Sequence, residues 1–360
     1  MKEIDQKTID RLIEVGYEPK EGPTLNFGEF PMKYETLLLS REDIQKCLDM
    51  STCLKIVEQV FKAHGEANVV MPPKLSLNLE GADGWVNAMP AYVGPFDAAG
   101  LKWVGGWGGN IERGLPFIMG SILLIDPQTG LLLSVMEGGF ITDLRTGAAT
   151  GVAARYLAKK DSAIVGLVGA GTQGRMQLRA LSNIFSLREV RVADIMPQPL
   201  ERFAREMERE LRVTIKKARN NQEAVEGADI IVTATTSHQV LVRREWVHRG
   251  AFVASIGSYP ELDPQLILTA EKVVVDSWAQ NKHRGELSPL VQEGLFGEEN
   301  MHGEIGKIVA GTIPGRENED EIIVACLIGL GSHDVGCAHF AYKEAKKRGL
   351  GSTFDFQQSR

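Results

Sequence analysis

The chain has 360 residues, of which 43% are hydrophobic and 24% charged, and its formal net charge is −7 at pH 7. This composition is typical of a globular protein and excludes a disordered or fibrous chain, and the length predicts two domains. The chain has no Lys/Arg-rich run, so we expect small-molecule partners and neither nucleic acid nor a membrane surface.

The N-terminal stretch MKEIDQKTIDRLIEVGYEPKEGP has acidic residues throughout and lacks the apolar core of a signal peptide, and no stretch approaches the length of a membrane span. We therefore expect a cytoplasmic protein. The cysteines show neither CxxC spacing nor a neighbouring histidine, so they predict packed, reduced thiols and no metal site. They are Cys47, Cys53, Cys326 and Cys337.

Residues 1–36 are expected to form a polar extension with a short helix from Asp5 to Val15. The stretch SREDIQKCLDMSTCLKIVEQVFKAHGEA follows, with apolar residues at helical spacing up to a stop at Gly65. Ser40 precedes Asp43 by three residues, which is the spacing of a capping box. Two helices are therefore predicted here.

From about Val69 to Phe140 the chain consists of short apolar runs separated by Gly, Pro, Asn and Asp, which predicts an antiparallel sheet or barrel. Two apolar runs flank residues 127–130, PQTG, and this pattern indicates a hairpin. Beyond Thr142 we expect a long Ala/Gly-rich helix, and then strands alternate with helices up to about Val324. Such alternation predicts a parallel sheet with right-handed crossovers.

The stretch SAIVGLVGAGTQGRMQL contains the pattern G-x-G-x-x-G at Gly169, Gly171 and Gly174. A strand is predicted before it, from Ala163 to Val168, and a helix after it, from Gln173 to Leu181. In this context the first glycine permits a tight turn, the second lets the backbone approach a pyrophosphate, and the third lets helix and strand pack closely. We therefore expect a bound dinucleotide, the alternative being a glycine turn without a nucleotide.

A second strand, in REVRVADIM, ends at Asp194, twenty residues after Gly174. This is about the interval at which an acidic residue meets the ribose hydroxyls of NAD. The carboxylate would repel a 2′-phosphate, and the next residues, IMP, include no arginine to receive one. The sequence therefore favours NAD over NADP. The remaining expected cofactor contacts are Thr146, Thr172, Gln173, Thr233, Thr235 and Gly257.

The stretch GLKWVGGWGGNIERGLPFIMGSILLIDPQTGLLLSVMEGGFITDLRTGAATGVAARYLA, followed by VGAGTQG, resembles the ornithine cyclodeaminase and mu-crystallin family. That family includes archaeal alanine dehydrogenase and several ketimine or imino-acid reductases. The resemblance covers roughly residues 37–352, including VAGTIPGRENEDEIIV and the closing AYKEAKKRGLG.

The resemblance implies an α/β fold. It combines a Rossmann-type parallel sheet domain, residues 146–325, with an N-terminal α+β domain, residues 37–145 and 326–360. The N-terminal domain carries an antiparallel sheet, binds substrate and forms a homodimer, and the last helix returns to it.

Three positions match the family's basic residues that bind substrate: Lys102, Arg145 and, where the family commonly has arginine, Lys74. A guanidinium holds a carboxylate with two charge-assisted hydrogen bonds, so we expect Lys102 and Arg145 to act in catalysis and all three residues to bind an amino, imino or keto acid. The alternatives are an ion pair of Arg145 with Asp143, if that segment is extended, and a solvated surface lysine at position 102.

The sequence departs from the family after the stretch GAFVASIG. Ornithine cyclodeaminases carry an Asp and then Pro-Gly-Lys there, whereas Gly257 is followed by SYPELD, residues 258–263. Glu261 and Asp263 match an acidic pair at the start of the next helix, where carboxylates favour the helix N-terminus. Leu327 stands where the family often has a serine facing the nicotinamide. The missing Asp argues against a deaminating cyclisation.

Three functions remain open. The first is an NAD-dependent reductase of a cyclic ketimine or an α-imino acid, which needs mainly orientation of substrate and cofactor. The second is a cyclodeaminase of the lyase class, against which the missing Asp counts. The third is a cofactor-loaded binding protein, as the role of mu-crystallin suggests.

Overall fold

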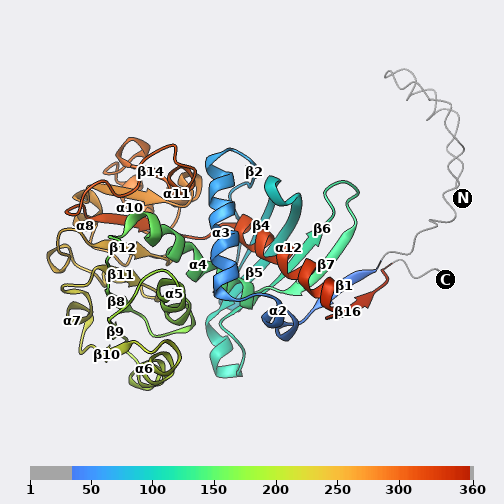
Figure 1. Cartoon of the computed structure of the whole chain (residues 1–360), viewed down its shortest axis with the longest axis horizontal. Coiled ribbons are helices and arrows are strands. Elements are labelled where there is room, and N and C mark those ends of the chain that lie inside the picture. Colours follow the sequence, from blue (N-terminus) through green and yellow to red (C-terminus); the bar gives the residue numbers. More distant parts are fainter. Residues whose placement is uncertain (1–34, 357–360) are drawn as a thin grey trace, which may run out of the picture. The chain divides into compact units, whose positions relative to one another are not determined.

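The computed structural model describes residues 35–356, so the helix expected from Asp5 to Val15 lies outside the described residues. Residues Thr36–Phe354 form one compact unit that contains two sheets (Figure 1). No helix in the described part of the chain is long and apolar enough to cross a membrane.

The first sheet has the order β16-β1-β7-β6-β5-β4-β2, with β3 also paired to β4. Its described strands are β1 (Thr36–Leu39), β2 (Val69–Val70), β3 (Leu75–Leu79), β4 (Gly84–Val93), β5 (Ala98–Trp107), β6 (Ile118–Ile125), β7 (Leu132–Glu137) and β16 (Ser352–Phe354). Neighbouring strands are antiparallel except β1 and β7, which are parallel. The prediction of an antiparallel sheet is confirmed.

The hairpin predicted around residues 127–130 is the connection from β6 to β7. The Gly130 N–H donates to the Asp126 carbonyl at 2.8 Å, and the Asp126 N–H donates to the Leu131 carbonyl at 2.9 Å. Gly130 has a φ of +75°, which a glycine adopts without the steric cost of a Cβ.

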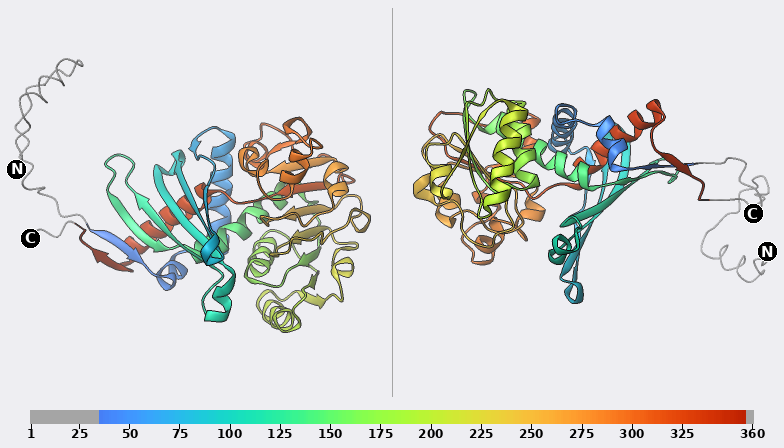
Figure 2. Two further views of the ribbon diagram at one scale, coloured as in Figure 1. Left: turned by 180° about the vertical axis from the view of Figure 1, so that it is seen from behind. Right: turned by 90° about the horizontal axis from the view of Figure 1, so that it is seen from below.

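Three helices accompany this sheet: α2 (Arg41–Cys47), α3 (Met50–Gly65) and α12 (Gly331–Arg348). The capping box is confirmed, because the Asp43 N–H donates to the Ser40 hydroxyl and the Ser40 N–H donates to the Asp43 carboxylate. Helix α12 packs against β4, β5 and β6 and against α3 (Figures 1 and 2). The last helix thus returns to the antiparallel sheet, as the family resemblance implied.

The second sheet has the order β10-β9-β8-β11-β12-β15-β13-β14, and every neighbouring pair is parallel. Its described strands are β8 (Ile164–Val168), β9 (Glu189–Ala193), β10 (Thr214–Lys217), β11 (Ile230–Thr233), β12 (Phe252–Ser255), β13 (Lys272–Val275), β14 (Gly303–Glu304) and β15 (Ile323–Cys326). The central strands are continuous apolar runs because both faces of a parallel sheet are covered. The predicted Rossmann-type sheet is confirmed.

The helices of this half are α4 (Gly139–Leu157), α5 (Thr172–Ser182), α6 (Pro197–Leu211), α7 (Asn221–Val225), α8 (Pro264–Leu268), α9 (Trp278–Asn281), α10 (Leu287–Gln292) and α11 (Ile305–Val309). Short 3₁₀ turns are η1 (Glu80–Ala82), η2 (Gly94–Phe96), η3 (Gly108–Arg113), η4 (Arg244–Trp246) and η5 (Glu298–Asn300). Helix α4 contacts α3 and β6 as well as α5 and β12, so it links the two sheets. The sequence predicts a domain boundary between residues 145 and 146. Helix α4 runs unbroken across these two residues, and the domain boundary stays a prediction.

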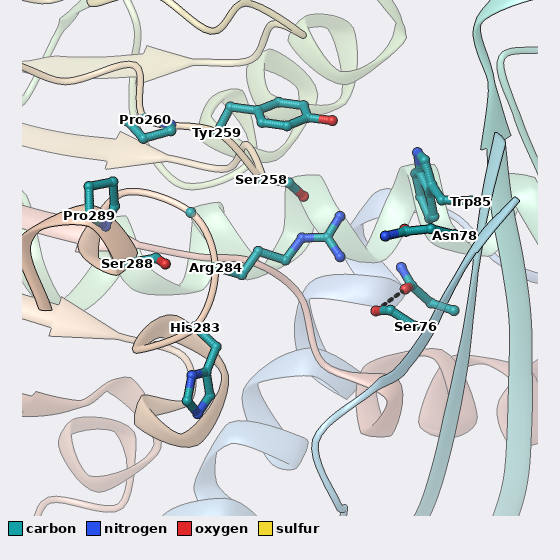
Figure 3. A pocket seen from close by; sticks show the side chains of 12 residues that line it. Ser76, Asn78, Trp85, Ser258, Tyr259, Pro260, His283, Arg284, Ser288 and Pro289 are labelled. Carbon is teal, nitrogen blue, oxygen red and sulfur yellow. Dashed lines mark hydrogen bonds between the residues drawn. The ribbon is translucent and has the colours of Figure 1, made fainter. Parts of the chain in front are cut away.

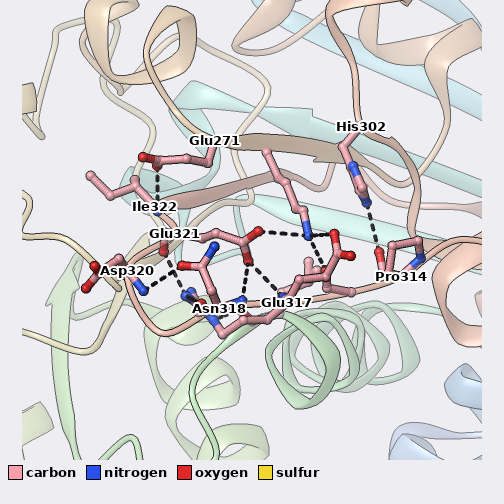
Figure 4. A network of polar contacts seen from close by, with 12 residues as sticks. Glu271, His302, Pro314, Glu317, Asn318, Asp320, Glu321 and Ile322 are labelled. Atoms are coloured by element: carbon pink, nitrogen blue, oxygen red, sulfur yellow. Dashed lines mark hydrogen bonds and ion pairs between the residues drawn. The ribbon is translucent and has the colours of Figure 1, made fainter.

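The stretch VAGTIPGRENEDEIIV, which contributed to the family resemblance, forms a polar network beside β13 and β15 (Figure 4). Lys272, which is buried, contacts Glu317 at 2.7 Å and Glu321 at 3.0 Å. The Glu271 carboxylate accepts a hydrogen bond from the Ile322 N–H at 2.8 Å. This stretch therefore anchors the two strands.

Candidate active site

The glycine-rich turn joins β8 to α5. Other atoms pack closely against Gly169 and Gly174, whereas the space beside Gly171 is open. Gly169 has a φ of +109°, and a Cβ there would lie 2.5 Å from the Ala234 carbonyl oxygen. A Cβ at Gly174 would lie 2.2 Å from the Gly169 carbonyl oxygen, whereas a Cβ at Gly171 would meet no atom within 4 Å. Gly171 is the N-cap of α5 and offers no capping side chain. The open position beside uncapped helix N–H groups fits a pyrophosphate.

Asp194 follows β9 and lies against this turn. Its Oδ2 accepts a hydrogen bond from the Ala170 N–H at 2.7 Å, and its Oδ1 accepts one from the Met196 N–H at 2.8 Å. Arg175 also reaches the turn, but its guanidinium contacts Glu206 at 3.0 Å and donates to the Ala170 carbonyl at 2.7 Å. The cation beside the turn is thus already paired, which agrees with a preference for NAD over NADP.

The other residues expected to contact the cofactor lie on α4, at the start of α5 and beyond β11. The Thr146 hydroxyl donates to the Thr142 carbonyl at 2.7 Å within α4. Thr172 and Gln173 open α5, and the Gln173 amide donates to Asp143 at 3.3 Å. Thr172 is exposed beside the open side of the turn.

Thr233 and Thr235 lie at the carboxyl end of β11 and beyond it. Thr233 is buried and its hydroxyl has no partner within the described residues, while the Thr235 hydroxyl contacts the Glu261 carboxylate. The position of Glu261 in the sequence suggested that it would cap the next helix, but in the structure it does not. It is buried with a raised pKa caused by burial, and its Oε2 lies 3.2 Å from where a Cβ at Gly257 would be. Asp263 does cap α8, because it accepts from the Gln265 N–H.

Lys102 of β5 and Arg145 of α4 meet at one carboxylate, Asp334 of α12. Lys102 Nζ lies 2.7 Å from Asp334 Oδ2, and Arg145 Nε lies 3.1 Å from Asp334 Oδ1. Lys102 is 1% exposed, Arg145 6% and Asp334 0%. The alternative of a solvated surface lysine at position 102 is therefore wrong.

The alternative pairing of Arg145 with Asp143 is also wrong. Helix α4 begins at Gly139, so positions 143 and 145 point about 200° apart around the helix axis. Asp143 instead lies 3.6 Å from Arg41. Asp334 accepts from Nε of Arg145, and within residues 35–356 the two Nη atoms make no hydrogen bond; they lie against Gly329, where a Cβ would be 2.5 Å from Nη1.

Lys74 lies just before β3 and donates to the Ile328 carbonyl at 3.0 Å. Burial and then the charge of Arg284 lower the pKa of Lys74 to about 7. Burial and then the charge of Arg145 lower the pKa of Lys102 to about 8. Burial raises the pKa of Asp276 to about 6, and that carboxylate accepts from the Gly329 N–H at 2.6 Å. The structure thus brings the buried cations Lys102 and Arg145 close enough to the half-buried Lys74 for their charges to lower its pKa.

A cavity of about 300 Å³ lies near this cluster (Figure 3). Strand pairing places Ser76 opposite Asn87 and Asn78 opposite Trp85, so these four side chains share one face of β3 and β4. The lining residues are Ser76, Asn78, Trp85, Asn87, Ser258, Tyr259, Pro260, His283, Arg284, Gly285, Ser288 and Pro289.

Asp276, Arg284 and Asp334 were not expected from the sequence. Asp334 offered a weak signal, because a charged residue in the otherwise small and apolar start of α12 needs a buried partner. Asp276 follows the apolar strand β13, where strand ends often carry functional groups. Arg284 lies in a loop whose sequence has no periodicity, and its position beside β3 and β4 follows only from the tertiary fold.

Comparison with known proteins agrees with this geometry. The model of the ornithine cyclodeaminase/mu-crystallin family matches residues 34–349. The chain belongs to this family. It is 37% identical over 327 residues to the alanine dehydrogenase of Archaeoglobus fulgidus, covering 89% of this chain and 99% of that protein.

Two solved structures of the family superpose on this chain with a TM-score of 0.85 and 37% identity. One is the Thermococcus litoralis Δ1-pyrroline-2-carboxylate reductase in complex with NADH and L-proline, which covers 88% of this chain and 99% of its own. The other is an archaeal alanine dehydrogenase dimer with bound NAD, which covers 90% of this chain and 100% of its own. The family resemblance found in the sequence is confirmed.

The sequence predicts that the loop of residues 258–263 departs from the ornithine cyclodeaminases. Ser258 and Tyr259 of this loop line the cavity. The Tyr259 ring lies 3.8 Å from the His238 ring, measured between centroids. The loop therefore presents hydroxyl and aromatic groups to the cavity.

Proposed function

We propose that this chain is an NAD-dependent reductase of an α-imino acid or a cyclic ketimine, which is equivalent to an amino-acid dehydrogenase running in reverse. The observation that carries the proposal is that two buried cations, Lys102 and Arg145, meet at one carboxylate, Asp334. The same compact unit contains a glycine-rich turn that is open at Gly171. A buried cation pair binds a carboxylate, and the turn fits a dinucleotide. The similarity to an alanine dehydrogenase and to a Δ1-pyrroline-2-carboxylate reductase supports the same chemistry.

The cofactor would be held at the turn and at the strand ends. The turn that Gly169, Gly171 and Gly174 form would receive the pyrophosphate at its open position, Gly171, and Asp194 would bind the ribose hydroxyls. Further contacts would come from Thr146, Thr172, Gln173, Thr233, Thr235 and Gly257. The relatives solved with NADH or NAD support this choice of cofactor.

In the proposed reaction, the Nη edge of Arg145 and the ammonium of Lys102 hold the substrate carboxylate. Asp334 positions both cations through its two oxygens. When bound, the cofactor would supply the hydride for the imine carbon. Lys74, whose pKa is about 7, is suited to give a proton to the imine nitrogen near neutral pH.

We also propose a homodimer formed through the outer face of the antiparallel sheet, which faces away from Ser76 and Asn78. Strand register places Leu75 opposite Ala88 and Ala88 opposite Trp103, so their side chains share that face. Its large apolar side chains are 37–65% exposed. They are Leu75, Leu77, Leu79, Trp103 and Met119. A contiguous exposed apolar face is typical of an interface, and the similar archaeal alanine dehydrogenase is a dimer. The expected cytoplasmic location stays a prediction from the N-terminal sequence.

The test is Arg145→Lys, assayed by NADH oxidation with 2-oxo acids plus ammonium and with cyclic imines. Lysine keeps the charge but loses the fork, so substrate binding should weaken by about 1–3 kcal/mol. Thermal stabilisation by NAD should be unchanged, because a ligand bound elsewhere to the folded state still raises the melting temperature. Arg155→Lys is the matched control, because Arg155 lies on the same helix but pairs with Glu58 on an exposed surface. An unaltered substrate dependence in Arg145→Lys would refute the proposed role.

A further inference from the structure

Arg284 is a half-buried arginine without an acceptor. It lies between α9 and α10, and its guanidinium projects toward Trp85 and Asn78 in the cavity (Figure 3). Its Cζ lies 5.6 Å from the centroid of the Trp85 ring. Within residues 35–356, its side chain makes no hydrogen bond or ion pair. By contrast, the half-buried guanidinium of Arg316 donates to the carbonyls of Leu157 and Glu321 at 2.8 Å each.

The surroundings of Arg284 are suited to an anion. Burial lowers the pKa of Arg284, because a guanidinium that loses contact with water is less stable in its charged form. The Ser76 hydroxyl donates to Asn87 Oδ1 at 2.6 Å, and within the described residues the Asn87 amide N–H groups have no acceptor, so they can donate to a ligand. Asn78 and Ser258 add further neutral donors, and the cavity lining contains no aspartate or glutamate. A cation ringed by neutral donors binds a carboxylate more strongly than a neutral group.

The cavity lies near the cluster that would hold the substrate's first carboxylate. Lys74 lies two residues before Ser76, and the charges of Arg284, Arg145 and Lys102 all act on it. Asp334 pairs with Lys102 and Arg145, and Lys74 lies near Asp276, whereas within the described residues no carboxylate lies within ion-pair distance of Arg284. Arg284 is therefore available to a carboxylate of a ligand.

We propose that Arg284 binds a second carboxylate of the substrate, at the end of the side chain away from the carbon that accepts hydride, so that the protein selects dicarboxylic imino acids. This inference rests on the proposed imine reductase activity. Asn87, Asn78 and Ser258 complete the subsite. Gly171, where the pyrophosphate would lie, is not among the residues that line this cavity.

The test compares 2-oxo acids of equal length with ammonium and NADH: oxaloacetate against 2-oxobutyrate, and 2-oxoglutarate against 2-oxopentanoate. The dicarboxylate of at least one pair should have a kcat/KM about 10- to 150-fold higher, which is what one charge-assisted contact supplies. Arg284→Met should bring that ratio close to one, and Arg284→Lys should give an intermediate ratio. Arg243→Met is the matched control, because Arg243 lies 5.8 Å over the Trp246 ring, outside the cavity lining, and it should keep the wild-type ratio.

A binding measurement separates this inference from the proposed function. With NAD present, succinate or glutarate should raise the melting temperature of the wild type more than butyrate does, and Arg284→Met should abolish the difference.

If imines are reduced but the dicarboxylate preference is absent, or survives in Arg284→Met, the subsite is refuted and the reductase stands. If no imine is reduced, the reductase is refuted, and the melting shifts still decide the subsite. Weaker NAD binding in Arg284→Met would assign the residue to the cofactor and overturn the proposal. Should Arg284→Met fail to fold, Arg284→Lys decides by its ratio.

Discussion

Replacing Asp334 by asparagine should strongly destabilise the protein, because the two cations that it neutralises would remain buried. Asp334 is 0% exposed and lies 2.7 Å from Lys102 Nζ and 3.1 Å from Arg145 Nε. Asparagine keeps the shape but not the charge. Removing one partner of a buried ion pair costs about 3–5 kcal/mol, so we expect the free energy of unfolding at pH 7 to fall by about that amount.

The loss should depend on pH with a definite sign. Lys102 already has its pKa lowered to about 8 from the ordinary value of 10.5, and without Asp334 its pKa falls further. Between that lowered pKa and the pKa of the unfolded chain, the native state binds fewer protons than the unfolded state, so stability rises with pH. The deficit of Asp334→Asn relative to wild type should therefore be smaller at pH 9 than at pH 7.

Urea denaturation followed by tryptophan fluorescence and circular dichroism measures both effects. Glu58→Gln is the matched control, because its partner Arg155 is exposed, and this change should cost at most about 1 kcal/mol. A loss below about 1 kcal/mol for Asp334→Asn, or an equal loss at pH 7 and pH 9, would refute the reasoning from buried charge.

Gly171→Val should leave the melting temperature of the NAD-free protein nearly unchanged, because a Cβ there meets no atom within 4 Å, but should abolish stabilisation by NAD; a retained NAD shift in calorimetry would contradict this. The kcat/KM for imine reduction should fall as pH rises through about 7, where Lys74 loses its proton, and fall further through about 8, where Lys102 loses its proton. Lys102→Arg should remove the limb near pH 8 and keep the limb near pH 7, and persistence of the limb near pH 8 would assign it to another group. Trp103→Glu should yield monomers in light scattering, because Trp103 is 44% exposed on the outer sheet face; an intact dimer would place the interface elsewhere.

Local patterns in the sequence predicted the features that depend on local geometry. The glycines at 169, 171 and 174 are spaced by the needs of one strand-turn-helix unit, and the structure places each where that spacing indicated. The capping box at Ser40 and the hairpin after Ile125 likewise involve residues close together in the chain. Their energetics are decided within a few residues, so the sequence contains the whole signal.

The candidate site depends on contacts between distant segments, which no local pattern shows. Asp334 lies 189 residues from Arg145 in the chain, and only the return of α12 to the antiparallel sheet brings them together. The alternative partner, Asp143, looked plausible because an extended segment would place it on the same face as Arg145, whereas α4 begins at Gly139 and makes this segment helical. Arg284 and Asn87 likewise meet through the packing of two halves of the chain.

The most direct test of the account is NADH consumption by the purified wild-type protein with 2-oxo acids plus ammonium and with cyclic imines, run beside an ammonia-release assay on ornithine. Reduction of carbon–nitrogen double bonds, with NADH preferred over NADPH, is the predicted result. Ammonia release from ornithine without NADH consumption on any imine would contradict it.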